Sequence, residues 1–123
     1  MAIPLHNLDT ATPEEYDWGW IRWLMSDQIE SGSAATVGIV QINPGKSNPL
    51  HYHPNCEELL YMTAGKCEHR YGEETVTMKA GDMIRVPQDV LHRARSVGDE
   101  PMQAVIVFSS GTRKTVMVDE DGV

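Results

Sequence analysis

The chain has 123 residues, of which 41% are hydrophobic, and it carries a formal net charge of −8 at pH 7. This length suffices for one small domain that buries about two-thirds of its unfolded surface. The acidic balance argues against nucleic acid or an anionic membrane surface as a partner, because phosphate groups are bound by basic patches. No apolar run approaches the roughly 18 residues that a membrane-spanning helix needs.

The first residues of the chain are expected to form an N-terminal extension, 1–30, that holds a short helix and a first strand. Its beginning lacks the charged and apolar regions of a signal peptide, so a cytoplasmic protein is predicted. The helix is predicted over 12–17. Thr12 is its candidate N-cap, Pro13 takes the first helical position, and Glu15 follows three residues after the cap.

All three tryptophans of the chain follow this predicted helix closely, at Trp18, Trp20 and Trp23. So many large aromatic side chains ahead of the main strands either cover an open end of the fold or form a contact between two copies. Plain core packing is the third interpretation. We favour the interface interpretation, and with it a homodimer.

The rest of the chain alternates short strand patterns with turn sequences. The predicted strands are 20–25, 36–42, 50–53, 58–63, 66–71, 75–79, 83–86, 92–96, 102–109 and 114–118. Turn residues such as Asn43-Pro44-Gly45 and Ala80-Gly81-Asp82 separate them. Many short strands at regular spacing, with almost no helix, predict an all-β sandwich or barrel.

Strand alternation sorts these side chains into an inner and an outer face. If the histidines at 51, 53 and 92 and the glutamate at 58 point inward, the charged Arg93 and Arg95 fall on the solvent side, as they should. The inward set is then His51, His53, Glu58, Leu60, Met62, Cys67, His69, Tyr71, His92, Ala94 and Ser96. The two cysteines, Cys56 and Cys67, do not make a disulfide scaffold and are expected to be free structural thiols.

Two histidines two residues apart point the same way from a strand, with Cα atoms roughly 6–7 Å apart. His51 and His53 have this spacing, so their rings can converge on one ion. The carboxylate of Glu58 and the ring of His92, from other strands, would complete the site. A set of imidazole nitrogens and a carboxylate suits one divalent transition metal: Fe, Mn, Ni, Co, Cu or Zn. The competing interpretation is four unrelated polar side chains.

Two segments carry these residues, Gly45-x5-His51-x-His53-x4-Glu58-x6-Gly65 and Gly81-x5-Pro87-x-Asp89-x2-His92. Together they resemble the paired signature motifs of the cupin family. Asp89 departs from the family's usual glycine, and Ser96 from its usual asparagine. The resemblance implies a double-stranded β-helix, or jelly-roll barrel, over 31–118, with a C-terminal tail at 119–123. It also implies that His51, His53, Glu58 and His92 are the metal ligands.

The same resemblance allows several activities on a small-molecule substrate. The predicted function is a metal-dependent enzyme that acts on a small polar or carboxylated metabolite, with an oxygenase ahead of a lyase or isomerase. His69 and Tyr71 are the candidates for a catalytic acid, base or hydrogen-bond donor that does not ligate the metal. The alternative is a non-catalytic cupin that binds a metal or a small ligand, as in a sensor module.

Overall fold

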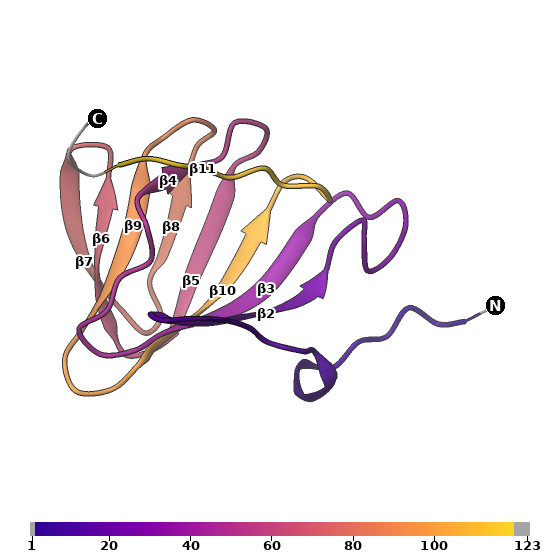
Figure 1. Ribbon diagram of the computed structural model, residues 1–123, viewed down its shortest axis with the longest axis horizontal. Coiled ribbons are helices and arrows are strands. Elements are labelled where there is room, and N and C mark those ends of the chain that lie inside the picture. Colours follow the sequence, from indigo (N-terminus) through magenta and orange to yellow (C-terminus); the bar gives the residue numbers. More distant parts are fainter. Residues whose placement is uncertain (1, 120–123) are drawn as a thin grey trace.

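The computed structural model describes residues 2–119, which are built almost entirely of β-strands. The strands are β1 (Glu14–Tyr16), β2 (Gly19–Met25), β3 (Thr36–Ile42), β4 (His51–Tyr52), β5 (Glu58–Ala64), β6 (Lys66–Tyr71), β7 (Glu74–Lys79), β8 (Met83–Val86), β9 (His92–Val97), β10 (Met102–Phe108) and β11 (Val116–Met117). They form a six-stranded sheet in the order β1-β2-β3-β10-β5-β8 and a five-stranded sheet in the order β11-β4-β9-β6-β7. Figure 1 shows the strands curving around a common interior.

Neighbouring strands in both sheets pair antiparallel, and most neighbours are far apart in sequence. β10, for example, pairs with β3 on one side and with β5 on the other. This arrangement confirms the predicted jelly-roll barrel. Each predicted strand is found with bounds that differ by no more than two residues, although 114–118 is shortened to Val116–Met117.

The core lies between the two sheets and is filled by alternate residues of each strand. In β10, Ala104, Ile106 and Phe108 are buried while their neighbours are only partly so. The predicted faces of β5, β6 and β9 are confirmed in the same way, since Met62, Cys67 and Ser96 are fully buried. Tyr71 differs from this set because it is only partly buried at the end of β6. Both cysteines are free and buried.

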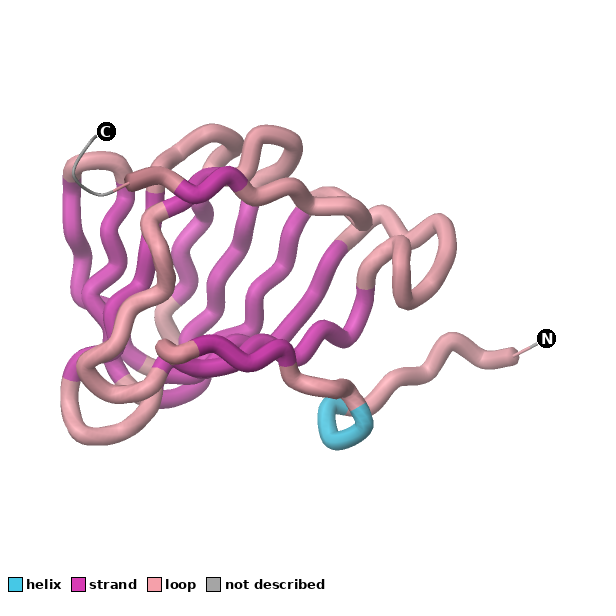
Figure 2. The backbone as a smooth tube through the Cα atoms, viewed as in Figure 1, coloured by secondary structure: helices cyan, strands magenta, loops and turns pink. Residues whose placement is uncertain are grey.

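The predicted helix over 12–17 is wrong. Residues 14–16 form the edge strand β1, which pairs with Gly19–Ile21 in a tight hairpin. The capping pattern at Thr12 is a local signal, and the hydrogen bonds gained by joining the sheet outweigh it. The helical turn that does form is a short 3-10 helix at Leu8–Thr10, where the Asn7 side chain accepts from the backbone N–H of Asp9. Figure 2 shows this turn in cyan.

The N-terminal segment is nevertheless part of the larger sheet, since β1 and β2 are two of its six strands. Trp18 is buried in the core and Trp23 packs against it. Trp20 instead stacks with Arg22, whose guanidinium carbon lies over the ring, 5.1 Å from its centroid. Two of the tryptophans therefore take core positions, and the homodimer stays a prediction. Of the predicted tail at 119–123, residues 120–123 lie outside the described part of the chain.

Within residues 2–119, no helix has the length and apolar character needed to cross a membrane.

Candidate metal centre and the adjoining cavity

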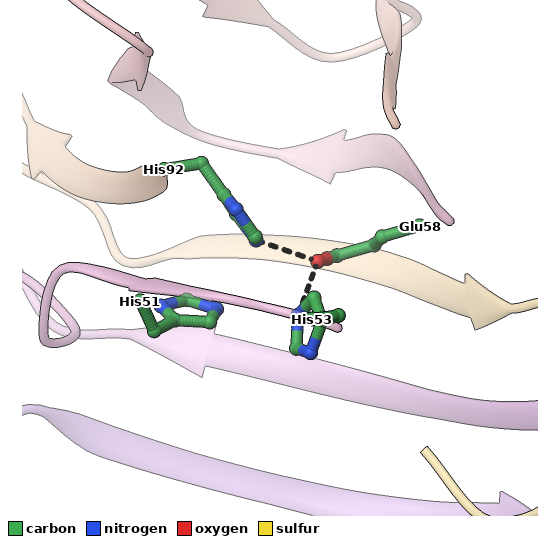
Figure 3. Close-up of side chains that lie close together, drawn as sticks. All are labelled: His51, His53, Glu58 and His92. Carbon is green, nitrogen blue, oxygen red and sulfur yellow. Dashed lines mark hydrogen bonds and ion pairs between the residues drawn. The ribbon is translucent and has the colours of Figure 1, made fainter. Parts of the chain in front are cut away.

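Four side chains from separate parts of the barrel converge at one point. His51 lies in β4, Glu58 begins β5 and His92 begins β9, while His53 follows β4 directly. His51 and His92 are register partners across the β4–β9 pair. All four side chains are buried, and one ligand atom from each lies within 4.8 Å of those of the other three. In Figure 3 these side chains point toward one another. The group could hold a metal ion.

The three imidazole rings are held in the same tautomer by backbone carbonyls. A carbonyl can only accept a hydrogen bond, so the Nδ1 atom that faces it must carry the proton. The Nδ1–oxygen distances are 2.7 Å from His51 to Pro49, 2.9 Å from His53 to Lys114 and 2.9 Å from His92 to Val90. Each Nε2 atom therefore keeps its lone pair, which is the form in which imidazole binds a metal.

The carboxylate of Glu58 lies against the Nε2 atoms of two of these rings, so that hydrogen-bond acceptors face one another. Its Oε1 atom lies 3.2 Å from Nε2 of His53 and 2.9 Å from Nε2 of His92. If both Nδ1 atoms carry the ring protons, a carboxylate oxygen faces nitrogen lone pairs with no proton between them. Either an additional proton or a cation must lie there. The spacing matches adjacent ligands of a six-coordinate ion, which stand about 3 Å apart when metal–ligand bonds are about 2.1 Å long.

The electrostatics of the group favour a neutral imidazole beside an ionised carboxylate. Burial, helped by the nearby His92, lowers the pKa of His51 to about 4. Burial alone would raise the pKa of Glu58, but its close contacts with the imidazoles of His53 and His92 outweigh burial and hold that pKa well below its usual range. Unprotonated imidazole and carboxylate are the states that a divalent transition metal requires of its ligands.

A cavity of about 400 Å³ is lined by three of the four side chains, His51, His53 and Glu58, and is mostly apolar. Its aromatic walls come from Trp18, Trp23 and Phe108. Apart from His51, His53 and Glu58, its polar lining consists of Tyr16, Asn48, Arg113 and Thr115. A volume of this size admits a small organic molecule.

The two predicted catalytic candidates lie outside this lining. His69 is buried behind the centre, with its ring nearly parallel to that of His92 and 6.0 Å away between centroids. Its Nδ1 atom is buried without a hydrogen-bond partner in the described structure, and burial lowers its pKa to about 4. Tyr71 pairs with His92 across β6 and β9 and is partly buried. Their catalytic role stays a prediction.

Sequence reasoning missed the residues that face the cavity from its rim. Tyr16 belongs to the edge strand that was expected to be a helix, and its ring stacks on Trp18 with centroids 4.7 Å apart. Arg113 and Thr115 lie in an irregular segment between β10 and β11. No spacing rule marks a residue in such a segment, because its position depends on contacts made far away in sequence.

Comparison with known proteins agrees with this geometry. The cupin domain family model matches residues 38–108. The chain belongs to the cupin family. Protein SchB of Streptomyces halstedii is 31% identical over 103 residues, covering 84% of this chain and 73% of that protein. Polyketide synthase CurC of Streptomyces cyaneus is 31% identical over 97 residues, covering 79% of this chain and 63% of that protein.

A solved structure of Bacillus subtilis oxalate decarboxylase, which has Mn(II) centres, superposes on this cupin with a TM-score of 0.83 at 25% identity. The match covers 90% of this chain and 31% of that one. The cupin therefore spans about a third of the decarboxylase chain. The shared barrel supports a metal-binding cupin without indicating which reaction, if any, this chain performs.

Proposed function

We propose that this cupin is a metal-dependent enzyme that holds one divalent transition ion on His51, His53, Glu58 and His92. The observation that carries the proposal is the common tautomer of the three histidines. Each Nδ1 atom is committed to a backbone carbonyl, and two of the Nε2 atoms lie 2.9–3.2 Å from a single carboxylate oxygen. A centre built only from hydrogen bonds would need further protons to satisfy the same atoms.

Four protein ligands leave up to two positions of a six-coordinate ion for substrate or dioxygen. The bound ion would supply Lewis-acid chemistry or the electron transfer that an oxygenase needs. The chain's own contribution is to keep the imidazoles neutral, to fix their orientation through backbone carbonyls and to exclude water with apolar walls. We propose an oxygenase ahead of a lyase or isomerase, acting on a small molecule whose apolar body fills the cavity.

The named relatives support a small-molecule substrate, because they include a polyketide synthase protein and an oxalate decarboxylase. A cytoplasmic homodimer is part of the proposal.

A second candidate function is non-catalytic binding of a metal or small ligand. One observation favours it: among the described residues, the cavity lining offers no histidine or carboxylate beyond the proposed ligands. The hydroxyls of Tyr16 and Thr115 are the remaining groups able to pass a proton there, and burial raises the pKa of the Tyr16 phenol.

The experiment that separates the two functions begins with metal analysis of protein purified without a metal-affinity column. We expect close to one divalent ion per chain. The Fe(II) form, prepared without oxygen, should then bind nitric oxide and give the spin signal of an iron nitrosyl, because open positions remain. Stoichiometric metal with no nitric oxide adduct would contradict the oxygenase and support the binding function. Absence of metal would contradict the metal-dependent enzyme and, of the second function, would leave only the binding of a small ligand.

A further inference from the structure

Arg113 brings a positive charge to the wall of an otherwise apolar cavity. Its guanidinium carbon lies 4.4 Å from the ring centroid of Trp23 and 5.1 Å from that of Phe108. Both rings also line the cavity. Among the described lining residues, Arg113 is the only lysine or arginine. A planar cation laid on aromatic walls is held in one orientation, with its N–H groups directed around the edge of that stack.

The segment that carries Arg113 is tied to the first histidine motif. The Asn55 side chain donates to the carbonyl of Thr112 at 2.9 Å and accepts from the backbone N–H of Lys114 at 2.8 Å. The Lys114 carbonyl in turn accepts from Nδ1 of His53. Arg113 is thereby enclosed between two residues that are fixed to the loop of the metal centre. The hydrogen bonds of Asn55 and Lys114 therefore fix Arg113 and His53 relative to each other.

Arg113 has no carboxylate partner within the described structure. None of the ion pairs there includes it, and the hydrogen bond of its side chain goes to the hydroxyl of Thr115. The nearby Glu14 accepts instead from the Trp23 indole at 2.5 Å. Burial lowers the pKa of Arg113, with Glu58 acting in the opposite direction. A half-buried guanidinium with no carboxylate in direct contact is unfavourable, and an anion bound against it would reduce that cost.

The hydroxyl of Thr115 also places this charge relative to the centre. It bonds to Arg113 on one side and lies 3.2 Å from Nδ1 of His53 on the other. A single side chain therefore separates the guanidinium from a proposed metal ligand. Because Arg113 and His53 also line the same cavity, one small molecule there can contact both.

We propose that Arg113 binds the carboxylate of an aromatic or similarly apolar acid that occupies the cavity. Stacked guanidinium groups recognise carboxylates through paired N–H donors, and the aromatic walls of Trp18, Trp23 and Phe108 accommodate a flat apolar body. The inference rests on the proposed function, since it names the class of substrate or ligand of that same cavity. Its test is independent of the metal.

The test compares benzoate with benzamide, which has nearly the same shape but no charge. Binding is measured by calorimetry and by tryptophan fluorescence, in metal-free protein and in zinc-loaded protein. We expect benzoate to bind at least about tenfold more tightly in both forms, because hydrogen bonds to charged groups are the stronger ones. Arg113→Gln should abolish this preference, and Arg113→Lys should restore part of it. Arg22→Gln, which removes an arginine that stacks on Trp20 outside the cavity, should leave it unchanged.

Each other result overturns the inference. A preference that survives Arg113→Gln, or that appears only with zinc, would mean that the carboxylate binds the ion instead. Equal binding of the two probes, or no binding of benzoate to the metal-free protein, would leave Arg113 with a packing role alone. The metal content of the unmodified protein tests the proposed function separately, so the two can fail independently.

Discussion

The backbone N–H of Asp89 donates a hydrogen bond to the carbonyl of His53, with a nitrogen–oxygen distance of 3.0 Å. This bond joins the loop that leads to the third histidine to the segment that carries the second. Asp89 has a φ of 69°. Among the described residues, all others with a positive φ are glycines. Asp tolerates this left-handed conformation better than most residues do. The departure from the usual cupin glycine therefore leaves the backbone path intact.

Replacing Asp89 separates the effect of its conformation from that of its side chain. Asp89→Gly should change the free energy of unfolding little, because relief of backbone strain is offset by greater freedom of the unfolded chain. Asp89→Val should destabilise by about 1–3 kcal/mol, since a β-branched residue strongly disfavours positive φ. Urea unfolding of both variants measures the difference. Equal stability of the Gly and Val variants would show that the fold does not require a positive φ at position 89.

Removal of a proposed ligand should abolish metal binding without unfolding the barrel. His92→Ala deletes one imidazole of the four-residue group, so we expect the bound metal to fall well below one ion per chain. His6→Ala is the matched control, because His6 pairs with Glu30 at the surface, with atoms 2.7 Å apart. Elemental analysis of the purified proteins measures both. Full occupancy in His92→Ala would contradict the assignment of the ligands.

Chelation should leave the fold in place. The core of apolar side chains from both sheets, including Met62, Met102 and Phe108, contains none of the proposed ligands. Metal should still raise the melting temperature, because it binds the folded chain alone, and this adds about 2.7 kcal/mol when free ion is about a hundred times Kd. Circular dichroism with and without chelator measures both effects. Loss of the β-type spectrum on chelation would show that the metal, and not the core, maintains the barrel.

Asn55 should influence the centre without touching it. Asn55→Ala removes both hydrogen bonds that hold the segment of Thr112 and Lys114, so we expect a loss of about 1–3 kcal/mol in stability. Because Lys114 orients His53, metal affinity should also fall, by about three- to tenfold. Asn7→Ala, which removes the cap of the distant 3-10 helix, serves as the control. Competition against a fluorescent zinc chelator measures the affinities. Unchanged affinity in Asn55→Ala would show that His53 is oriented independently of this loop.

The barrel and the four-residue centre could be predicted because both are encoded by spacing. Alternation placed His51, Glu58 and His92 on inner faces, and burial confirmed it. Such patterns survive folding because a strand fixes the direction of every second side chain. The cupin motifs then identified which strands meet.

The other residues of the cavity are not marked by any regular spacing in the sequence. Thr12 and Pro13 favour a helix when only neighbours are considered, yet residues 14–16 find their hydrogen bonds on the edge of β2. Arg113 reaches the cavity because Asn55, more than fifty positions earlier, holds its loop. Tyr71 follows the inward pattern of β6 but lies at the strand's end and does not line the cavity. Periodicity gives the direction of a side chain and not its depth along the barrel.

The carbonyls that orient the three imidazoles belong to Pro49, Val90 and Lys114, and none of the three bonds uses a side-chain acceptor. A point mutation can therefore replace any of these side chains while the peptide group that fixes the ring remains. The protonation pattern of the centre therefore depends on the path of the backbone and not on the side chains at these three positions. Homologues that have diverged across most of their surface can keep it unaltered, leaving the cavity walls free to evolve toward new ligands.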